Sequence, residues 1–533
     1  MRITNKMMTT NMQSNISRNK ANMSVLGNQY STGQKIQRPS EDPVVAVRSL
    51  KYRTQLSELN QYYEKNIPDA LAWMDVTEGA LDSVNDVLKS INTQCNEGSN
   101  DSLNVENRKS IIATLQQYKQ QIYEQYGNTD YAGRYVFTGY RTDTPLLFNE
   151  ATNKKTYTIT ENFSKVDITS IPYLSKEVEY SSLPAASDPA YYAAQAPSLQ
   201  EAHRIRLSYG NLDSAPIAPA TASPFKEISF SAKNAAGNVI QYKLDVNGMT
   251  ATDNSTVPAT VTTSAADKVN FISSSTANAY NPTAGINYIY DTGELIISNS
   301  VFTSTNMEQA ENISVQYDKT EFAKADARPE HYFACTTADR GTAGTGTTDI
   351  LYDAPHDQNI QYEVNFSQKL TVNTMACNSI SLNIGRTIDE ISRAANELEA
   401  SETKLAETNK MIADPANASK LDALNELKKQ LDTEIALKSK VLQNKFGKAI
   451  TMTTDEQDRV NVALSDHGSR YVRLEMTESR LSTQQVDFKD MLQKNDGVNL
   501  EDIIIDYNAA QVTYNASLSS AAKVVTNTLL DFL

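Results

Sequence analysis

The sequence predicts a multi-domain α+β protein, with a long α-helical bundle or coiled coil built from both chain ends and a β-rich middle domain. Of the 19 glycines and 16 prolines among the 533 residues, 24 lie between positions 127 and 385. Apolar residues recur at helical spacing in the two arms outside this region and alternate with period two within it. The expected segments are 1–42, 43–148, 149–370, 371–497 and 498–533.

The first segment is expected to be an assembly helix followed by a rigid turn. Its apolar stripe is rich in methionine and includes Met8, Met12 and Leu26. The turn contains Arg38-Pro39-Ser40 and Asp42-Pro43, and proline both fixes its own φ and restricts the residue before it. Asp42 can cap the next helix. Pro43 suits the first position of that helix, because the backbone N–H that proline lacks has no hydrogen-bond partner within the helix there.

Segments 43–148 and 371–497 are expected to be the two halves of the helical bundle. Each carries apolar residues at steps of three, four or seven, which is typical of a bundle seam, and we expect the two seams to pack on each other. In the first half a polar stretch interrupts the stripe at 96–101. In the second half the stripe predicts three successive helices, with bounds 387–412, 418–446 and 455–494.

Segment 149–370 is expected to form one or more β-rich outer domains. Alternating apolar residues predict strands at 155–159, 240–246 and 313–317, and a hairpin over 286–297. Residues 133–139 alternate as well, which is consistent with a strand leaving the bundle or with a plain edge hairpin.

The last segment, 498–533, contains neither glycine nor proline and predicts an assembly helix. Its stripe advances by alternating steps of four and three residues. The stripe consists of Leu500, Ile504, Tyr507, Gln511, Tyr514, Leu518, Ala521 and Val525. Nothing in the helix itself covers this apolar side, so its partner is the other chain end, another copy or another protein.

Composition argues against several classes of protein. With 49 basic and 64 acidic residues the net charge is −15, which disfavours nucleic acid as a partner. No apolar stretch approaches the roughly 20 residues of a membrane span, so no membrane partner is expected. The first 32 residues lack the apolar core of a cleaved signal peptide. The three cysteines, Cys95, Cys335 and Cys377, suggest neither a disulfide framework nor a structural zinc site.

We found no arrangement of residues that predicts catalysis. The sequence lacks the common metalloprotease, nucleotide-binding and serine-hydrolase motifs. Glu330-His331 with Cys335 is the one group that resembles a metal cluster, and a structural or surface role is the better interpretation because a second pair of ligands is missing. The sequence therefore predicts a protein that is not an enzyme and holds neither metal nor cofactor.

Several short motifs resemble the flagellin superfamily. At the N-terminus these are Met1-Arg2-Ile3-Thr4, Ser31-Thr32-Gly33-Gln34-Lys35-Ile36 and the run from Arg38 through Pro43. The tract 132–145, with sequence AGRYVFTGYRTDTP, resembles the hook–filament junction branch of that superfamily, as does the ending Leu529-Leu530-Asp531-Phe532-Leu533. We therefore add Leu530 and Phe532 to the expected assembly residues.

The resemblance implies a structural component of the bacterial flagellum that joins the hook to the flagellin filament. Such proteins are exported through the flagellar secretion channel without a cleaved signal peptide and act outside the cell. The implied partners are further copies in a ring, the hook-proximal hook-associated protein, flagellin, and an export chaperone at the C-terminal helix. The resemblance also implies that the two terminal helices pair only within the assembled tube.

Three alternatives remain open at this stage. The first is flagellin itself, the filament subunit, although the tract 133–145 and the ending at Leu533 favour the junction branch. From a different class, it could be a filament protein that carries an enzymatic insert in its middle domain. A cytosolic coiled-coil scaffold is the third possibility.

Overall fold

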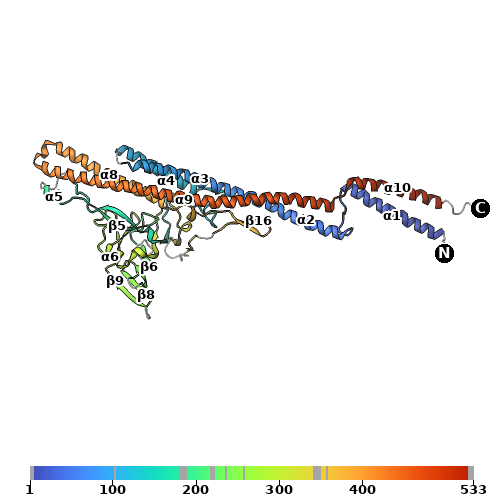
Figure 1. Ribbon diagram of the computed structural model, residues 1–533, viewed down its shortest axis with the longest axis horizontal. Coiled ribbons are helices and arrows are strands. Elements are labelled where there is room, and N and C mark those ends of the chain that lie inside the picture. Colours follow the sequence, from blue (N-terminus) through green and yellow to red (C-terminus); the bar gives the residue numbers. More distant parts are fainter. Residues whose placement is uncertain are drawn as a thin grey trace, which may run out of the picture. The chain divides into compact units, whose positions relative to one another are not determined.

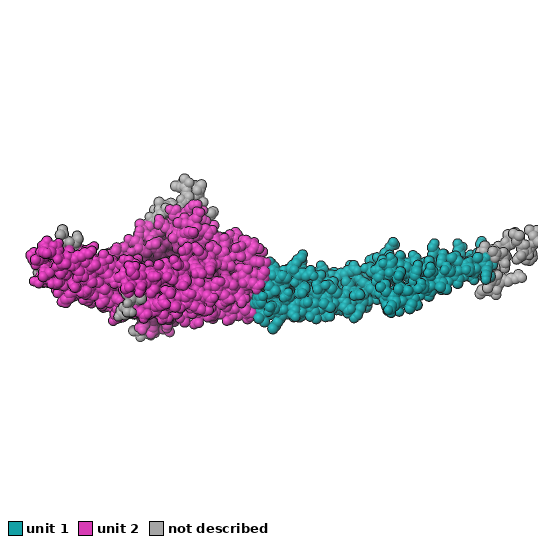
Figure 2. Space-filling view, turned by 90° about the horizontal axis from the view of Figure 1, so that it is seen from above, with its two compact units in different colours: residues 1–71, 362–370, 470–533 teal, residues 72–361, 371–469 magenta. Residues whose placement is uncertain are grey.

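The computed structural model describes residues 5–100, 104–180, 189–215, 223–234, 237–255, 259–339, 350–355 and 358–525 (Figure 1). The chain divides into two compact units (Figure 2). One comprises residues 1–71, 362–370 and 470–533, and the other comprises residues 72–361 and 371–469. Helical ends and a β-rich middle confirm the multi-domain α+β class. The five-segment division of the sequence stays a prediction.

The first unit contains two antiparallel helix pairs. Helix α1 (Asn5–Thr32) lies along α10 (Leu500–Val525), and α2 (Pro43–Gln61) lies along the C-terminal part of α9 (Leu421–Asp496). A π-helical turn, Tyr62–Asn66, follows α2 and leads into α3 (Ile67–Gly98). The short hairpin of β16 (Gln361–Asn365) and β17 (Gln368–Thr371) completes this unit.

The start of α2 confirms the expected cap. The Asp42 carboxylate accepts hydrogen bonds from the backbone N–H groups of Val44 (3.0 Å) and Val45 (3.2 Å), and Pro43 occupies the first turn. Near the same end of this pair, Asp496 accepts from Ser49 Oγ at 2.6 Å and from Arg53 Nη2 at 2.9 Å. The two ends of the chain are thus joined at this point by side-chain hydrogen bonds.

The helices of the second unit are the rest of α3, α4 (Val105–Gly127), α8 (Asn383–Ala413) and the N-terminal part of α9. Most of their expected seam residues are buried, whereas Tyr118, Ile435 and Leu464 are partly buried. The buried ones are Met74, Leu81, Val84, Leu88, Ile91, Ile111, Leu115, Ile122, Leu424, Leu427, Leu431 and Val460. Asn85 of α3 bonds Asn461 of α9 at 3.1 Å, and Lys119 of α4 bonds Asp389 of α8 at 2.6 Å. The prediction that the two seams pack on each other is confirmed.

The C-terminal half of the bundle differs from the expected three helices. Its first helix is present as α8, but 418–446 and 455–494 belong to α9, a single helix of 76 residues. The expected break falls at 447–454, where the sequence holds one glycine and no proline. Ala449 and Thr453, one turn apart, are both buried there, so the apolar stripe continues through the stretch.

The middle of the chain forms two main sheets. One has the strand order β10-β11-β12-β5-β4, and the other has the order β15-β14-β3-β13-β6-β7-β8-β9. All neighbouring strands whose register is known are antiparallel except the pair β10 and β11. Phe225 of β6 and Tyr288 of β11 are buried with ring centroids 5.2 Å apart, which places aromatic packing between the two sheets.

The strands have the following bounds: β3 Lys155–Phe163, β4 Thr169–Leu174, β5 Leu199–Arg206, β6 Phe225–Lys233, β7 Val239–Leu244, β8 Met249–Asp253, β9 Thr260–Ser264, β10 Val269–Ile272, β11 Ile286–Ile289, β12 Glu294–Ile297, β13 Glu311–Lys319, β14 Ala334–Asp339 and β15 Ile350–Tyr352. Short helices lie among them: α5 Pro189–Ala193, α6 Asn299–Ser304 and α7 Ala376–Ser379. The expected strands at 155–159, 240–246 and 313–317 correspond to β3, β7 and β13, and the expected hairpin is β11–β12.

The tract 133–139 is not a strand that leaves the bundle. It begins with a small hairpin of β1 (Asp130–Tyr131) and β2 (Arg134–Tyr135), and then Val136, Phe137 and Thr138 are all buried in succession. Phe137 stacks on Tyr126 at the end of α4, with 4.0 Å between ring centroids. The plain hairpin is the correct alternative, because three consecutive buried side chains do not fit a strand with one open face.

Within the part of the chain that the structure describes, no helix is both long and apolar enough to cross a bilayer.

Candidate assembly surface

The helix pair α1–α10 brings the expected terminal residues together. On α1 the partly buried positions advance by four and three residues: Met12, Ile16, Asn19, Met23 and Leu26. On α10 the buried or partly buried positions follow the same steps: Ile503, Tyr507, Ala510, Tyr514, Ser517 and Ala521. This period is that of a two-helix seam.

Specific contacts fix the register of the pair. Asn19 Nδ2 donates to Ser517 Oγ at 2.7 Å, and the rings of Tyr30 and Tyr507 stack with 6.2 Å between centroids. Gly27 also faces Tyr507: a Cβ at Gly27 would lie 3.2 Å from the tyrosine Cε2. The close approach of the backbone to this ring gives the glycine a packing role.

Backbone hydrogen bonds hold the two chain ends together where the pair begins. Lys35 N–H donates to Asp496 O at 2.7 Å, and Val498 N–H donates to Gly33 O at 3.1 Å. Gly33 has φ +67°, a left-handed conformation that ends α1 and favours glycine. The motif residues before α2 therefore lie beside the entry to α10.

The proline-containing turn is exposed and locally bonded. Glu41 N–H donates to Arg38 O at 3.0 Å, and Gln37 N–H donates to the Glu41 carboxylate at 2.8 Å. Arg38, Pro39 and Ser40 are exposed to solvent in the single chain. They are therefore accessible to another molecule.

Eight large apolar residues of the pair are exposed to solvent outside the seam, and together we call them the open apolar face. They are Met7, Met8, Val25, Leu500, Ile504, Ile505, Val512 and Leu518. Ile505 is 65% exposed and Val512 is 68% exposed, so both side chains are open to solvent in the single chain. Large apolar side chains left exposed on one short helix pair are typical of an interaction surface.

The expected α10 stripe divides between the seam and this open face. Tyr507 and Tyr514 lie in the seam, but Leu500, Ile504 and Leu518 are 52%, 42% and 42% exposed. The buried residue at the start of the seam is Ile503, which the sequence analysis missed. Ile503 and Ile504 precede Tyr507 by four and three residues, so either spacing fits a helix and the periodicity could not distinguish them. The side chain of Val525, and Leu530 and Phe532 entirely, lie outside the described residues.

The expectation that the terminal helices pair only within an assembled tube is wrong. They already pair in the single chain, through the contacts of Asn19 and Tyr30 given above. The partner of the C-terminal helix is therefore the other chain end, one of the three possibilities that its sequence allowed. In a pair of two helices each helix covers only the inner side of the other. The outer side of each helix therefore remains open to solvent.

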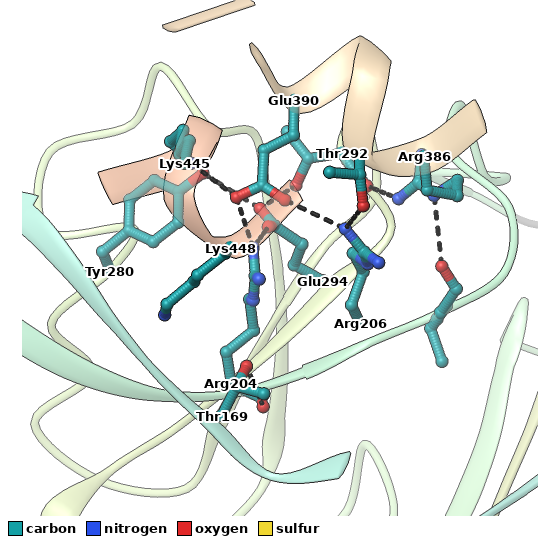
Figure 3. Close-up of polar contacts among 12 residues, drawn as sticks. Thr169, Arg204, Arg206, Tyr280, Thr292, Glu294, Arg386, Glu390, Lys445 and Lys448 are labelled. Atoms are coloured by element: carbon teal, nitrogen blue, oxygen red, sulfur yellow. Dashed lines mark hydrogen bonds and ion pairs between the residues drawn. The ribbon is translucent and has the colours of Figure 1, made fainter. Parts of the chain in front are cut away.

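A cluster of buried charges lies in the second unit and was not predicted (Figure 3). Arg204 Nη1, on β5, bonds the Glu294 carboxylate at 2.6 Å and the Glu390 carboxylate, on α8, at 2.8 Å. Arg206 Nη1 donates to the other oxygen of Glu390 at 3.1 Å, and Lys445 of α9 also bonds Glu390. The three cations hold the pKa of Glu390 well below its usual range, although burial acts in the opposite direction.

These residues are far apart in sequence, which explains why pattern analysis missed them. Arg204 and Arg206 alternate on one strand, Glu390 lies on one helix and Lys445 on another. Each fits a solvated face when considered alone. The one available signal was the R-x-R spacing, which places two cations on the same side of a strand.

The group weighed as a metal cluster is part of the protein core. Glu330, His331 and Cys335 are all buried, and the Glu330 carboxylate pairs with Arg328 at 3.4 Å. Burial, with Arg141 and Arg328 nearby, lowers the pKa of His331 to about 3. No group of three or more potential metal ligands occurs among the described residues.

Comparison with known proteins confirms the resemblance inferred from the motifs. Residues 3–142 match the family described as the bacterial flagellin N-terminal helical region. Flagellar hook-associated protein 3 of Salmonella typhimurium is 30% identical over 152 residues, and that of Escherichia coli is 28% identical over 150 residues. Each match spans 28% of this chain and 47% of the relative, so the chain covers about half the length of the curated relatives it matches.

Solved structures with the same description are also similar at low identity. The crystal structure of flagellar hook-associated protein 3 from Legionella pneumophila matches with 10% identity and a TM-score of 0.27, covering 83% of this chain and 97% of that one. A TM-score at this level does not establish a common arrangement of the whole chain.

Proposed function

We propose that this protein is a structural subunit of the bacterial flagellum that forms the junction between hook and flagellin filament, and that it is not an enzyme. The single observation that carries the proposal is the open apolar face of the α1–α10 pair. The relatives named flagellar hook-associated protein 3 match about 150 residues of the chain, which supports the junction role over a general coiled-coil scaffold.

In this proposal the terminal residues have two separate roles. Met12, Leu26, Tyr507 and Tyr514 hold α1 against α10 inside each subunit, because they lie in the seam. The residues that meet neighbouring subunits are on the open face or in the exposed turn: Met8, Leu500, Ile504, Leu518, Arg38, Pro39 and Ser40. Asp42 and Pro43 start the next helix and so set its position relative to the turn. Val525, Leu530 and Phe532 are proposed to extend the contact.

The proposed partners follow from a place between hook and filament. They are further copies of the chain in a ring, the hook-proximal hook-associated protein on one side and flagellin on the other. An export chaperone is proposed to cover the apolar face of α10 before assembly, since an exposed surface of this kind promotes aggregation. The protein would act outside the cell after export through the flagellar channel.

Flagellin itself is the second candidate, favoured by the match to the bacterial flagellin N-terminal helical region. Copy number separates the two functions, because a ring needs few copies and a filament needs very many. The test is quantitative mass spectrometry of sheared flagella, with a deletion strain as the control. A small, fixed number of copies per flagellum and detached filaments in the deletion strain are expected. A copy number equal to that of the main filament protein would favour flagellin, and recovery only from cytosol would overturn both.

A further inference from the structure

The second unit contains a cavity that the proposed assembly function does not use. Its volume is about 710 Å³, within the range of small-molecule pockets, which runs from about 300 to 1,000 Å³. Strands β3, β4 and β5 form one side, and α8 and α9 form the other. Arg204, Arg206, Glu390, Lys445 and Lys448 of the charge cluster line it.

Positive charge exceeds negative charge where the cluster meets the cavity (Figure 3). The cations Arg204, Arg206 and Lys445 share the carboxylate of Glu390, and Glu294 is the second carboxylate of the cluster. Lys448 Nζ donates to the backbone carbonyl of Ser170 at 2.7 Å rather than to a carboxylate. Four cations thus surround two carboxylates.

Arg386 adds a fifth cation to this cluster (Figure 3). It donates to the backbone carbonyls of Leu207, at 3.2 Å, and Thr292. The pKa of Arg206 is lowered to about 10, first by burial, and the nearby cations Arg204 and Arg386 act in the same direction. The surroundings of Arg206 therefore disfavour further positive charge, and a bound anion would reduce the repulsion among these cations.

The other carboxylates that line the cavity are engaged or open to water. Glu161 accepts from Ser208 N–H and from the Tyr317 hydroxyl, and burial raises its pKa. Asp167 accepts from Ser164 in its own turn. Asp455 is exposed at the rim. These groups do not neutralise the cations around Glu390.

A buried donor in the same place lacks a partner. Arg204 is 6% exposed, and its Nε has no hydrogen-bond partner among the described residues. An unsatisfied buried donor is costly, and a charged one more so. A ligand oxygen would satisfy it.

We propose that this cavity is a binding site for a small molecule that bears a carboxylate or phosphate group. Arg206 and Lys448 are the contacts within reach of an incoming ligand, because Arg206 retains 18% of its side-chain exposure and Lys448 is exposed. Arginine and lysine together suit oxyanions, through directed donors and a mobile point charge respectively. The site is separate from the assembly face.

The test is isothermal titration of the full chain with pyrophosphate and, separately, with citrate, using uncharged sorbitol as the negative probe. The two anions distinguish a phosphate site from a carboxylate site. Lys448→Met removes the exposed cation, and Lys440→Met removes an exposed lysine of the same helix that does not line the cavity. Both side chains are exposed, so circular dichroism should show the wild-type fold in each variant.

We expect one of the anions to bind with a stoichiometry of one, and Lys448→Met to weaken binding about tenfold, the loss typical of one charged hydrogen bond. Lys440→Met should bind as the wild type does. Arg206→Lys, which keeps the charge but loses the planar donors, should also weaken binding. Absence of binding by both anions, or equal loss in the two lysine variants, would overturn the proposal and leave the cluster as a clamp between sheet and helices.

Discussion

Asn19 of α1 donates a hydrogen bond of 2.7 Å to Ser517 of α10, a residue 498 positions later in the chain. The bond lies in the seam of the terminal helix pair, with Tyr30 stacked on Tyr507 further along. The subunit therefore presents its two ends as one element before it meets another copy. What it leaves open is the outer apolar face.

Gly27→Val should loosen the terminal helix pair. The added Cβ would lie 3.2 Å from the Tyr507 ring, and overpacking of this kind costs about 1–3 kcal/mol. Hydrogen exchange of the α10 amides should become faster. Gly79→Val is the matched control, because no atom lies within 4 Å of the added Cβ in helix α3. Unchanged exchange in Gly27→Val would mean that the seam does not pass through this glycine.

Ile503→Ala should reduce the stability of the free subunit, whereas Leu518→Ala should reduce assembly. Ile503 is 9% exposed, so truncation should lower the free energy of unfolding of the first unit by about 2–5 kcal/mol. Leu518 is 42% exposed, so truncation should change it by less than about 0.5 kcal/mol in the free subunit. Calorimetry of the purified chain measures this difference. Filament retention should nevertheless fall in Leu518→Ala, and a melting point several degrees lower in that variant would place Leu518 in the seam instead.

Gly447→Ala should stabilise the protein, because Gly447 lies inside the continuous helix α9. The added methyl group meets no atom within 4 Å, and alanine in a helix is favoured over glycine by about 1 kcal/mol. Urea unfolding should show this gain. Gly33→Ala is the contrasting variant: with φ +67° it should lose about 1–2 kcal/mol. A neutral result for Gly447→Ala would support the break between two helices that the sequence predicted.

His331 should make stability depend on pH. Burial lowers its pKa from 6.5 to about 3, so the unfolded chain binds a proton below pH 6.5 that the folded chain does not bind until about pH 3. The free energy of unfolding should therefore fall as pH decreases from 6.5, by at most about 1.4 kcal/mol per pH unit from this group.

Urea unfolding between pH 6.5 and 5, where most carboxylates remain ionised, measures this dependence. His331→Asn should reduce the slope, and His203→Asn, which replaces a histidine stacked on Phe302, should retain it. Equal slopes in the wild type and His331→Asn would show that His331 titrates normally.

The sequence predicted a helix or strand well where the spacing of its apolar residues fitted only one arrangement. Asp42-Pro43 marked the first turn of α2, and the start of the apolar stripe at Leu500 matches the start of α10. Ile503 and Ile504 are neighbouring apolar residues on different sides of α10, and either could have been the buried one. Only the packing of α10 against α1 buries Ile503 and leaves Ile504 exposed. The break expected near Gly447 failed because one glycine costs less than the continuing stripe of α9 contributes.

The charge cluster could not be predicted from local patterns. Arg204 meets Glu390 across 186 residues of sequence, and Lys445 meets it across 55. Pattern analysis detects neighbours on one helix or strand, whereas this contact depends on how the sheet lies against α8 and α9. The same reason applies to the seam contact between Asn19 and Ser517.

The most direct test of the central claim is filament retention in a deletion strain that expresses Leu518→Asp. This change places a charge on the open face of the terminal helix pair, whereas Val261→Asp places one on exposed strand β9 and serves as the matched control. Both proteins should be exported at wild-type levels. We predict that Leu518→Asp cells shed their filaments into the medium and Val261→Asp cells keep them. Normal filaments in Leu518→Asp cells would contradict the assignment of this face to assembly.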